Sequence, residues 1–178
     1  MNSNYQLLRR YTQSLPAGQL TWIGLRPARK KQMHEVEHVQ AIKGLGLDGD
    51  RRCRGSLGSA RQVTIISEEY IAQIEYFMSL SRKSGQGDIF GDYPAITPAM
   101  LRRNLVVSGI NLTAIRHQRL RIGDVELETT ALCDPCSRME EALGEGGFAA
   151  MIGHGGLCAK IVRGGTIRLG NSVELITS

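Results

Sequence analysis

The chain has 178 residues, enough for one domain with a substantial core. Its hydrophobic fraction of 42% is ordinary for a globular protein, and it contains no apolar run of roughly eighteen residues, which excludes a membrane-spanning helix. The net charge of +5 can attract a phosphate-bearing ligand, but the few aromatic residues (5%) do not alternate with basic ones, which disfavours a nucleic-acid binder.

Residues 1–19 are expected to form a tail or a short helix before a single domain at 20–178. Residues 1–15 carry arginines and no acids, as transit peptides do, yet they lack the apolar core of a secretory signal. We therefore expect a cytoplasmic protein. The four cysteines, without such a signal, indicate a reducing compartment, where close cysteines usually serve metal or redox chemistry.

The first half of the chain predicts short strands and one clear helix. Strands are expected at residues 20–25, 35–42 and 61–66. The glycine-rich, charged segment 43–59 is expected to lack regular structure. A helix at 68–80 follows, because Ser67 can cap its first turn and apolar residues recur on one face.

The second half predicts a loop, many short strands and two short helices. Serine, glycine, aspartate and proline make 81–98 loop-like. Strands are expected at 104–107, 119–122, 125–130, 157–163, 166–169 and 173–177, and helices at 137–143 and 148–152. Many short strands with glycine turns predict a mainly β fold, a closed β-barrel with a few short peripheral helices.

The sharpest local motif is the pair Cys133 and Cys136, separated by Asp134 and Pro135, between a predicted strand and a predicted helix. A thiol at a helix start is stabilised as a thiolate by unpaired N–H groups, and Arg138 acts in the same direction. Cys136 is nearer to the helix and is the better candidate for a reactive or metal-binding thiolate. Both cysteines can equally be small buried residues.

Two other uses of these cysteines remain open. A C-x-x-C pair can form a redox disulfide, but the βαβ unit that usually carries one is absent here. A zinc site can combine Cys133 and Cys136 with His154 and Cys158, although Gly153, Gly155 and Gly156 surround the histidine.

Basic residues precede the predicted strand at 104–107. Arg102, Arg103 and Asn104 suit a phosphate or the edge of a heterocycle, because guanidinium groups bind such ligands in a planar fork. Arg51 and Arg61 add charge that can face the same ligand. A solvated basic turn explains these residues equally well. Asp48 and Asp50 show no spacing that marks a pair of carboxylates for acid–base catalysis.

Taken in order, several segments resemble the MOSC domain family, named for the C-terminal domain of molybdenum cofactor sulfurase. They are GLDGDRR at 46–52, RQVTIIS at 61–67, LRRNLVVSGINL at 101–112, RLRIGDVELE at 119–128, CDPCSRMEEAL at 133–143, GHGG at 153–156 and RGGTIRLGNSVEL at 163–175. The resemblance covers about residues 20–177. It implies a β-barrel of the pyruvate-kinase-like type that holds a pterin-based molybdenum cofactor.

The resemblance also implies roles for individual residues. Cys136 corresponds to the family's metal-binding cysteine, and Arg102 and Asn104 correspond to its cofactor-holding R-x-N element. Arg51 and Arg61 match other basic positions. Many relatives carry a histidine after GDR, whereas this chain has Arg52 followed by Cys53. The aminotransferase-like domain of the full sulfurase is missing, so pyridoxal phosphate is not expected to bind.

Three functions remain as alternatives at this point. The first is a reductase of small N-hydroxylated compounds that uses Cys136-ligated molybdenum and a separate electron-donor protein. The second is a carrier in which Cys136 holds cofactor or a persulfide for an acceptor enzyme. The third is a zinc-stabilised or purely structural binding module.

Overall fold

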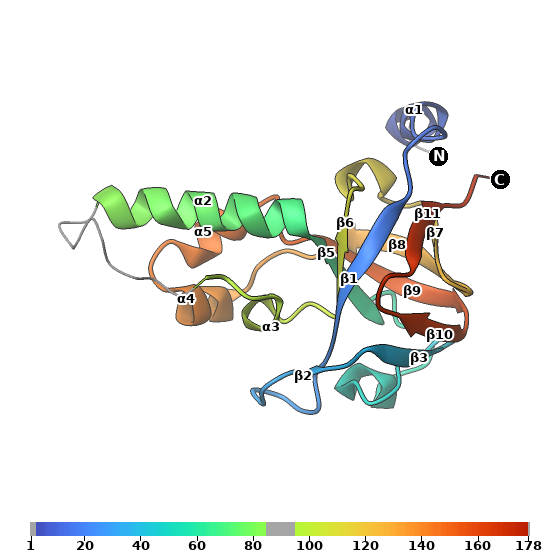
Figure 1. Ribbon diagram of the computed structural model, residues 1–178, viewed down its shortest axis with the longest axis horizontal. Helices are drawn as coiled ribbons and strands as arrows, with labels where there is room; N and C mark the ends of the chain where they lie inside the picture. Colours follow the sequence, from blue (N-terminus) through green and yellow to red (C-terminus); the bar gives the residue numbers. More distant parts are fainter. Residues whose placement is uncertain (1–2, 85–94, 178) are drawn as a thin grey trace.

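A computed structural model describes residues 3–84 and 95–177, and a closed barrel of seven strands forms its centre (Figure 1). Around the barrel the strand order is β11-β7-β8-β9-β5-β6-β1, and β1 pairs with β11 to close it. The strands are β1 (Gly18–Leu25), β5 (Val63–Ser67), β6 (Leu105–Ser108), β7 (Arg119–Ile122), β8 (Val125–Leu132), β9 (Leu157–Arg163) and β11 (Ser172–Leu175). Neighbouring strands are antiparallel except β5 and β6. The predicted mainly β barrel is confirmed.

A smaller sheet of β3 (His38–Ile42), β4 (Gly46–Leu47) and β10 (Gly165–Arg168) lies beside the barrel. The single strand predicted at 35–42 is wrong, because β2 (His34–Glu35) pairs with β1 while β3 pairs with β10. The expectation of no regular structure at 43–59 is also wrong. This segment contains β4 and the 3-10 helix η1 (Arg51–Arg54), whose first turn is capped by the Asp50 carboxylate accepting from the Arg52 amide at 2.9 Å.

Short helices gather on one side of the barrel, beside the longer α2 (Figure 1). The short helices are α3 (Pro98–Leu101), α4 (Ser137–Leu143) and α5 (Gly147–Met151), and the longer one is α2 (Glu68–Ser84). The helix α1 (Ser3–Tyr11) and the 3-10 helix η2 (Thr113–Ile115) lie elsewhere. The predicted cap of α2 is confirmed, because Ser67 Oγ accepts from the Tyr70 amide at 3.2 Å. No helix in the described ranges is long and apolar enough to span a membrane.

The loop predicted at 81–98 is wrong at both ends. Residues 81–84 continue α2, and Pro98 opens α3, whose first turn is capped by Thr97. Proline suits the first turn of a helix, so Pro98 begins α3 within a segment whose composition favours a loop. The stretch 85–94, also part of that prediction, lies outside the described residues.

The core has two parts, which meet at β5. Leu20, Ile65 and Leu127 belong to the cluster inside the barrel, whereas Ile66 and Met78 belong to a second cluster under the helices. Each large aliphatic side chain contributes about 1.5–3 kcal/mol when it is fully buried. Since β5 is covered on both faces, all five of its residues are buried, and its ends give fixed positions to the polar residues beside it.

Candidate functional site

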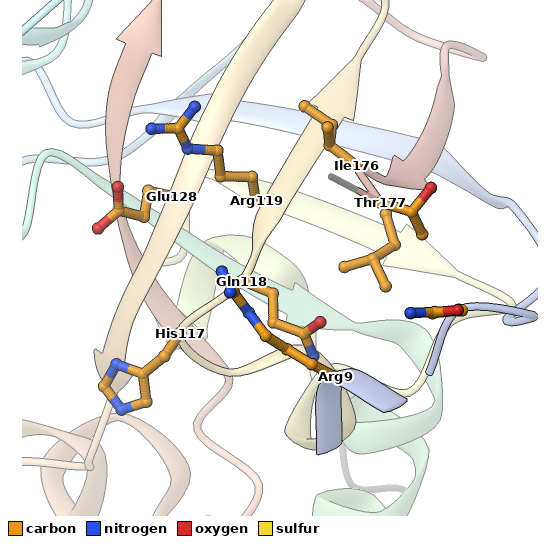
Figure 2. A pocket seen from close by; sticks show the side chains of 9 residues that line it. Arg9, His117, Gln118, Arg119, Glu128, Ile176 and Thr177 are labelled. Atoms are coloured by element: carbon orange, nitrogen blue, oxygen red, sulfur yellow. The ribbon is translucent and has the colours of Figure 1, made fainter. Parts of the chain in front are cut away.

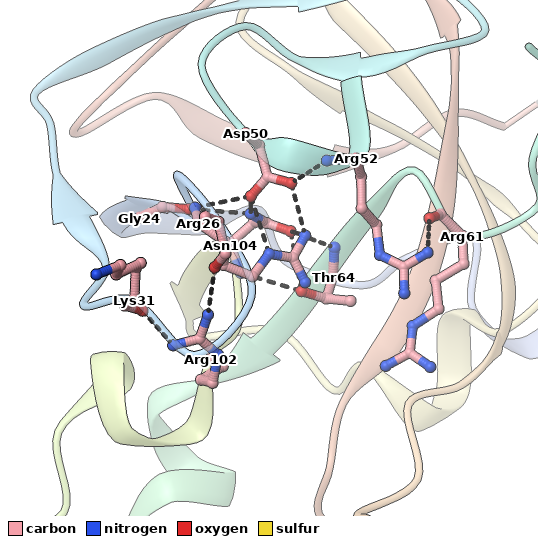
Figure 3. A network of polar contacts seen from close by, with 10 residues as sticks. Gly24, Arg26, Lys31, Asp50, Arg52, Arg61, Thr64, Arg102 and Asn104 are labelled. Carbon is pink, nitrogen blue, oxygen red and sulfur yellow. Dashed lines mark hydrogen bonds and ion pairs between the residues drawn. The ribbon is translucent and has the colours of Figure 1, made fainter. Parts of the chain in front are cut away.

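A buried carboxylate organises one edge of the barrel (Figure 3). Asp50 is 1% exposed, and Arg26, just after β1, binds it through Nε at 2.9 Å and Nη2 at 3.1 Å. The same carboxylate accepts from the backbone amides of Arg26 and Arg52, each at 2.9 Å. Burial by itself would raise the pKa of Asp50, but these bonds and the Arg26 charge lower it below its ordinary value. Asp50 is therefore ionised at neutral pH.

Asn104 joins three strands around this carboxylate. Its Oδ1 accepts from Arg26 Nη2 at 2.6 Å and from the amide and hydroxyl of Thr64 at 3.2 and 3.0 Å. Its Nδ2 donates to Gly24 O at 3.0 Å and to Asp50 Oδ2 at 2.9 Å. Asn104 is fully buried, so these protein partners occupy the amide that the sequence pattern offered to a ligand.

Arg102 lies at the end of α3 in a left-handed conformation with φ 55°. Its Nη1 donates to the carbonyl of Lys31 at 2.7 Å (Figure 3). Burial lowers its pKa, and the positive charges of Arg26, Arg51 and Arg138 lower it further. The structure thus brings the predicted residues Arg51, Arg102 and Arg138 into one electrostatic neighbourhood.

Arg52, next to Arg51, belongs to the same neighbourhood. Its pKa is lowered by burial and then by the charges of Arg26, Arg61 and Arg51. Its Nη1 donates weakly to Arg61 O at 3.4 Å, while its buried Nε finds no acceptor among the described residues. A buried donor without an acceptor costs about 1–3 kcal/mol, so this atom marks a place where an added acceptor would stabilise the protein.

The two cysteines of the C-x-x-C motif lie in different environments. Cys136 is exposed at the start of α4, and its side chain makes no capping hydrogen bond there. Cys133 is 1% exposed, and its Sγ accepts from Arg61 Nη2 at 3.1 Å. The guanidinium of the predicted site residue Arg61 therefore contacts a sulfur, while its charge also acts on Arg52. Cys136 is the accessible thiol of the motif.

Arg26 was not among the residues predicted from the sequence, and Arg103, predicted with Arg102 and Asn104 to face a ligand, points inward instead. Arg103 is 5% exposed and donates to three backbone carbonyls, those of Gly155 at 2.7 Å, Leu101 at 2.9 Å and Cys133 at 2.9 Å. It thereby ties α3 to the strands β8 and β9. The only sequence signal was the adjacency of Arg102 and Arg103, which does not tell which guanidinium points inward.

The zinc alternative is wrong for the described residues, because no group of three or more His, Cys, Asp or Glu side chains there is placed to hold a metal ion. The ring of His154 packs instead against Tyr70 and Phe77, with centroid distances of 5.7 and 5.5 Å. Cys136 is exposed whereas Cys133 and Cys158 are buried, so the sulfurs do not converge with the histidine.

A separate cavity of about 480 Å³ opens between α1 and the barrel (Figure 2). Arg9, Arg119 and Glu128 line it, together with His117 and Gln118. It contains none of the predicted site residues. Its size therefore does not bear on Arg51, Arg52, Arg102 and Arg138, which we call the arginine cluster.

Comparisons with known proteins agree with this fold. The family model described as MOSC domain matches residues 52–174. The crystal structure of the YuaD protein from Bacillus subtilis superposes with a TM-score of 0.70 at 19% identity, covering 90% of this chain and 96% of that one. YiiM from Escherichia coli gives a TM-score of 0.64 at 15% identity, covering 90% and 70%. A search of curated proteins finds no match.

Proposed function

The chain belongs to the MOSC domain family, which is associated with molybdenum-cofactor binding, and we propose that it holds this cofactor between its arginine cluster and Cys136. We further propose that it reduces small N-hydroxylated compounds with electrons from a separate donor protein. The observation that carries the proposal is that Arg51, Arg52, Arg102 and Arg138 form no ion pair with any of the described residues. Asp50 is the negative charge that acts on both Arg52 and Arg102, and its carboxylate is already bound to Arg26.

The residues of the cluster fit the charged part of such a cofactor. A phosphate offers acceptor oxygens, and guanidinium groups bind phosphate in a planar fork. Arg51, Arg102 and Arg138 supply the charge, and the buried Nε of Arg52 supplies a donor that still needs an acceptor. The cluster therefore fits an anionic ligand better than a neutral one.

Cys136 fits the metal-binding part. A thiolate is a soft ligand and suits a metal already bound by sulfur. The thiol is exposed, so no rearrangement of the core is needed to reach it. When bound, the molybdenum cofactor supplies the two-electron chemistry that converts an N–OH group into N–H and water.

The buried residues of the site act by positioning. Asn104 and Asp50 fix the ends of β1, β5 and β6 by their hydrogen bonds, and they thereby hold the residues of the arginine cluster in position. Arg61 donates to the sulfur of Cys133, and in this proposal it adds positive charge near the ligand. Pyridoxal phosphate has no part in this proposal.

The test is elemental analysis of protein purified from a host that makes the molybdenum cofactor. We expect about one molybdenum per chain in the wild type and in the control Cys53→Ser, and near-complete loss in Cys136→Ser. The double variant Arg102→Gln/Arg138→Gln is expected to lose both molybdenum and pterin. Equal molybdenum in wild type and Cys136→Ser would refute the ligand assignment.

The exposure of Cys136 also favours the second candidate, a carrier that hands cofactor or a persulfide sulfur to an acceptor enzyme. A reductase turns over N-hydroxylated substrates when an electron donor is supplied. A carrier instead shows cofactor or sulfane sulfur on Cys136 and no turnover. Assaying both properties on one preparation separates the two functions.

A further inference from the structure

A second pair of thiols lies inside the fold, on the neighbouring strands β8 and β9. Ala131 is paired with Cys158 and Leu132 with Leu157, and the amide of Cys133 donates to Gly156 O at 2.8 Å. Cys133 is thus opposite residue 156, two positions from Cys158, and side chains two positions apart share one face of a strand. The Cys158 thiol donates to Leu132 O at 3.9 Å, next to Cys133 in the chain, and Cys133 and Cys158 act on each other's pKa. Their residues are 1% and 3% exposed.

Two arginines surround this pair. Arg61 Nη2 donates to Cys133 Sγ at 3.1 Å, and Arg103 Nη2 donates to the carbonyl of the same residue at 2.9 Å. The interaction with Cys158 lowers the pKa of Cys133 to about 6, and the charges of Arg103 and Arg61 act in the same direction against the effect of burial. The same interaction and burial raise the pKa of Cys158. The pair therefore consists of one thiolate and one thiol.

We propose that Cys133 and Cys158 form a redox-active dithiol, distinct from Cys136, which hydroperoxides oxidise reversibly to a disulfide. A thiolate is the nucleophilic form of cysteine, and its neighbouring thiol can resolve the first oxidation product. Arg61 is an exposed residue that covers the sulfur of Cys133, so its displacement gives a small peroxide access to that sulfur.

The reaction balances in two steps. The Cys133 thiolate attacks the peroxide, a sulfur–oxygen bond forms, the oxygen–oxygen bond breaks, and the departing hydroxide takes a proton from solvent to become water. The sulfur of Cys158 then attacks the sulfenic acid, a disulfide forms, the sulfur–oxygen bond breaks, and the thiol proton leaves with the hydroxyl as a second water. The dithiol loses two electrons and the peroxide gains them.

The partner of Cys133 distinguishes this proposal from the C-x-x-C disulfide that the motif suggests. Cys136 is exposed at the start of α4, whereas Cys158 lies on the strand beside Cys133 and acts on its pKa. The expected linkage therefore joins two strands of the barrel, and it leaves Cys136 as a free thiol.

The test uses the native full-length chain, reduced and then treated with hydrogen peroxide. Remaining thiols are alkylated with N-ethylmaleimide, and peptides are mapped by mass spectrometry without reduction. We expect a Cys133–Cys158 peptide that disappears after dithiothreitol. A linkage between Cys133 and Cys136 would overturn the proposal, as would a pair that stays fully alkylatable while urea-unfolded protein is oxidised.

Matched variants sharpen the result. In Cys53→Ser/Cys136→Ser only the proposed pair remains, and we expect peroxide to remove both of its free thiols. Adding Cys158→Ala should stop the reaction at a sulfenic acid on Cys133, trapped by dimedone. A sulfenic acid that is trapped equally when Cys158 is present would contradict the resolving role of Cys158.

Discussion

Replacing Asp50 with asparagine tests the buried network most directly. Asp50→Asn preserves the size of the side chain but removes the charge that Arg26 contacts through two nitrogens, at 2.9 and 3.1 Å. An amide nitrogen also cannot accept hydrogen bonds. Either the Arg26 amide, Arg26 Nε and Asn104 Nδ2 lose their acceptor at Oδ2, or Arg26 Nη2 and the Arg52 amide lose theirs at Oδ1. Removing one partner of a buried ion pair typically costs about 3–5 kcal/mol.

The assay is urea unfolding at neutral pH, supported by thermal unfolding. For a domain of this size, about 1 kcal/mol corresponds to a change in melting temperature of roughly 2–4 °C, so we expect a decrease of about 6–20 °C. The matched control is Glu174→Gln, which breaks the ion pair with Arg121, whose side chains are 39% and 54% exposed. Such an exposed pair contributes about 0–1 kcal/mol. If Asp50→Asn lost no more stability than the control Glu174→Gln, the buried ion pair would not contribute as argued.

The pH dependence gives an independent check. Because the folded-state pKa of Asp50 is lowered, its contribution is fully present above the unfolded-state pKa of about 3.9 and is lost as the pH falls through the folded-state pKa. The stability difference between wild type and Asp50→Asn should therefore be constant near neutrality and shrink below about pH 4. If the stability difference between the two proteins grew as the pH fell, a group other than Asp50 would dominate the pH dependence of stability.

Two further predictions concern the strand ends and the buried thiolate. Gly156 has φ 81°, and an added Cβ would lie 2.0 Å from Ile65 O, whereas Gly153 has φ 80° and nothing within 4 Å. Gly153→Ala should therefore lower the free energy of unfolding in urea by about 1–2 kcal/mol, and Gly156→Ala should lower it clearly more. Equal decreases for the two variants would contradict the close contact at Gly156. In an ultraviolet titration of thiolate absorbance, we expect a step near pH 6 that Cys133→Ser removes, since the pKa of Cys133 is lowered to about 6. Persistence of the step in the variant would assign it to another cysteine.

Much of the barrel follows from local sequence patterns. The short β-branched strands and the Ser67 cap of α2 are local features, and the structure has them where the sequence predicts. The division of 35–42 into β2 and β3 depends on which distant strand each half pairs with, and periodicity within the segment carries no such information. The same limit explains why the sequence does not predict η1, because the Asp50 carboxylate that caps this helix is held in place by the distant Arg26.

The candidate site shows a similar limit. Asp50 was set aside because its spacing from Asp48 does not mark a catalytic pair of carboxylates, yet its partner is an arginine 24 positions away. Arg26 stands at the start of a basic loop, where composition favours a solvated side chain. Asn104 carried a family signal for ligand binding, and its complete hydrogen bonding inside the protein appears only when β1 and β5 are placed on either side of it.

The placement of the acidic residues gives the arginine cluster its chemical character. The exposed ion pairs Arg121–Glu174, Lys160–Glu128 and Arg163–Glu126 all lie on the barrel strands β7, β8, β9 and β11, away from the cluster. At the cluster itself, Asp50 neutralises Arg26, and the neighbouring guanidiniums keep their charge. A ligand that binds only the folded state stabilises that state by mass action. Under the proposed function, an anionic cofactor would therefore relieve the mutual repulsion of these arginines, so that loading of the site and stability of the fold would rise together.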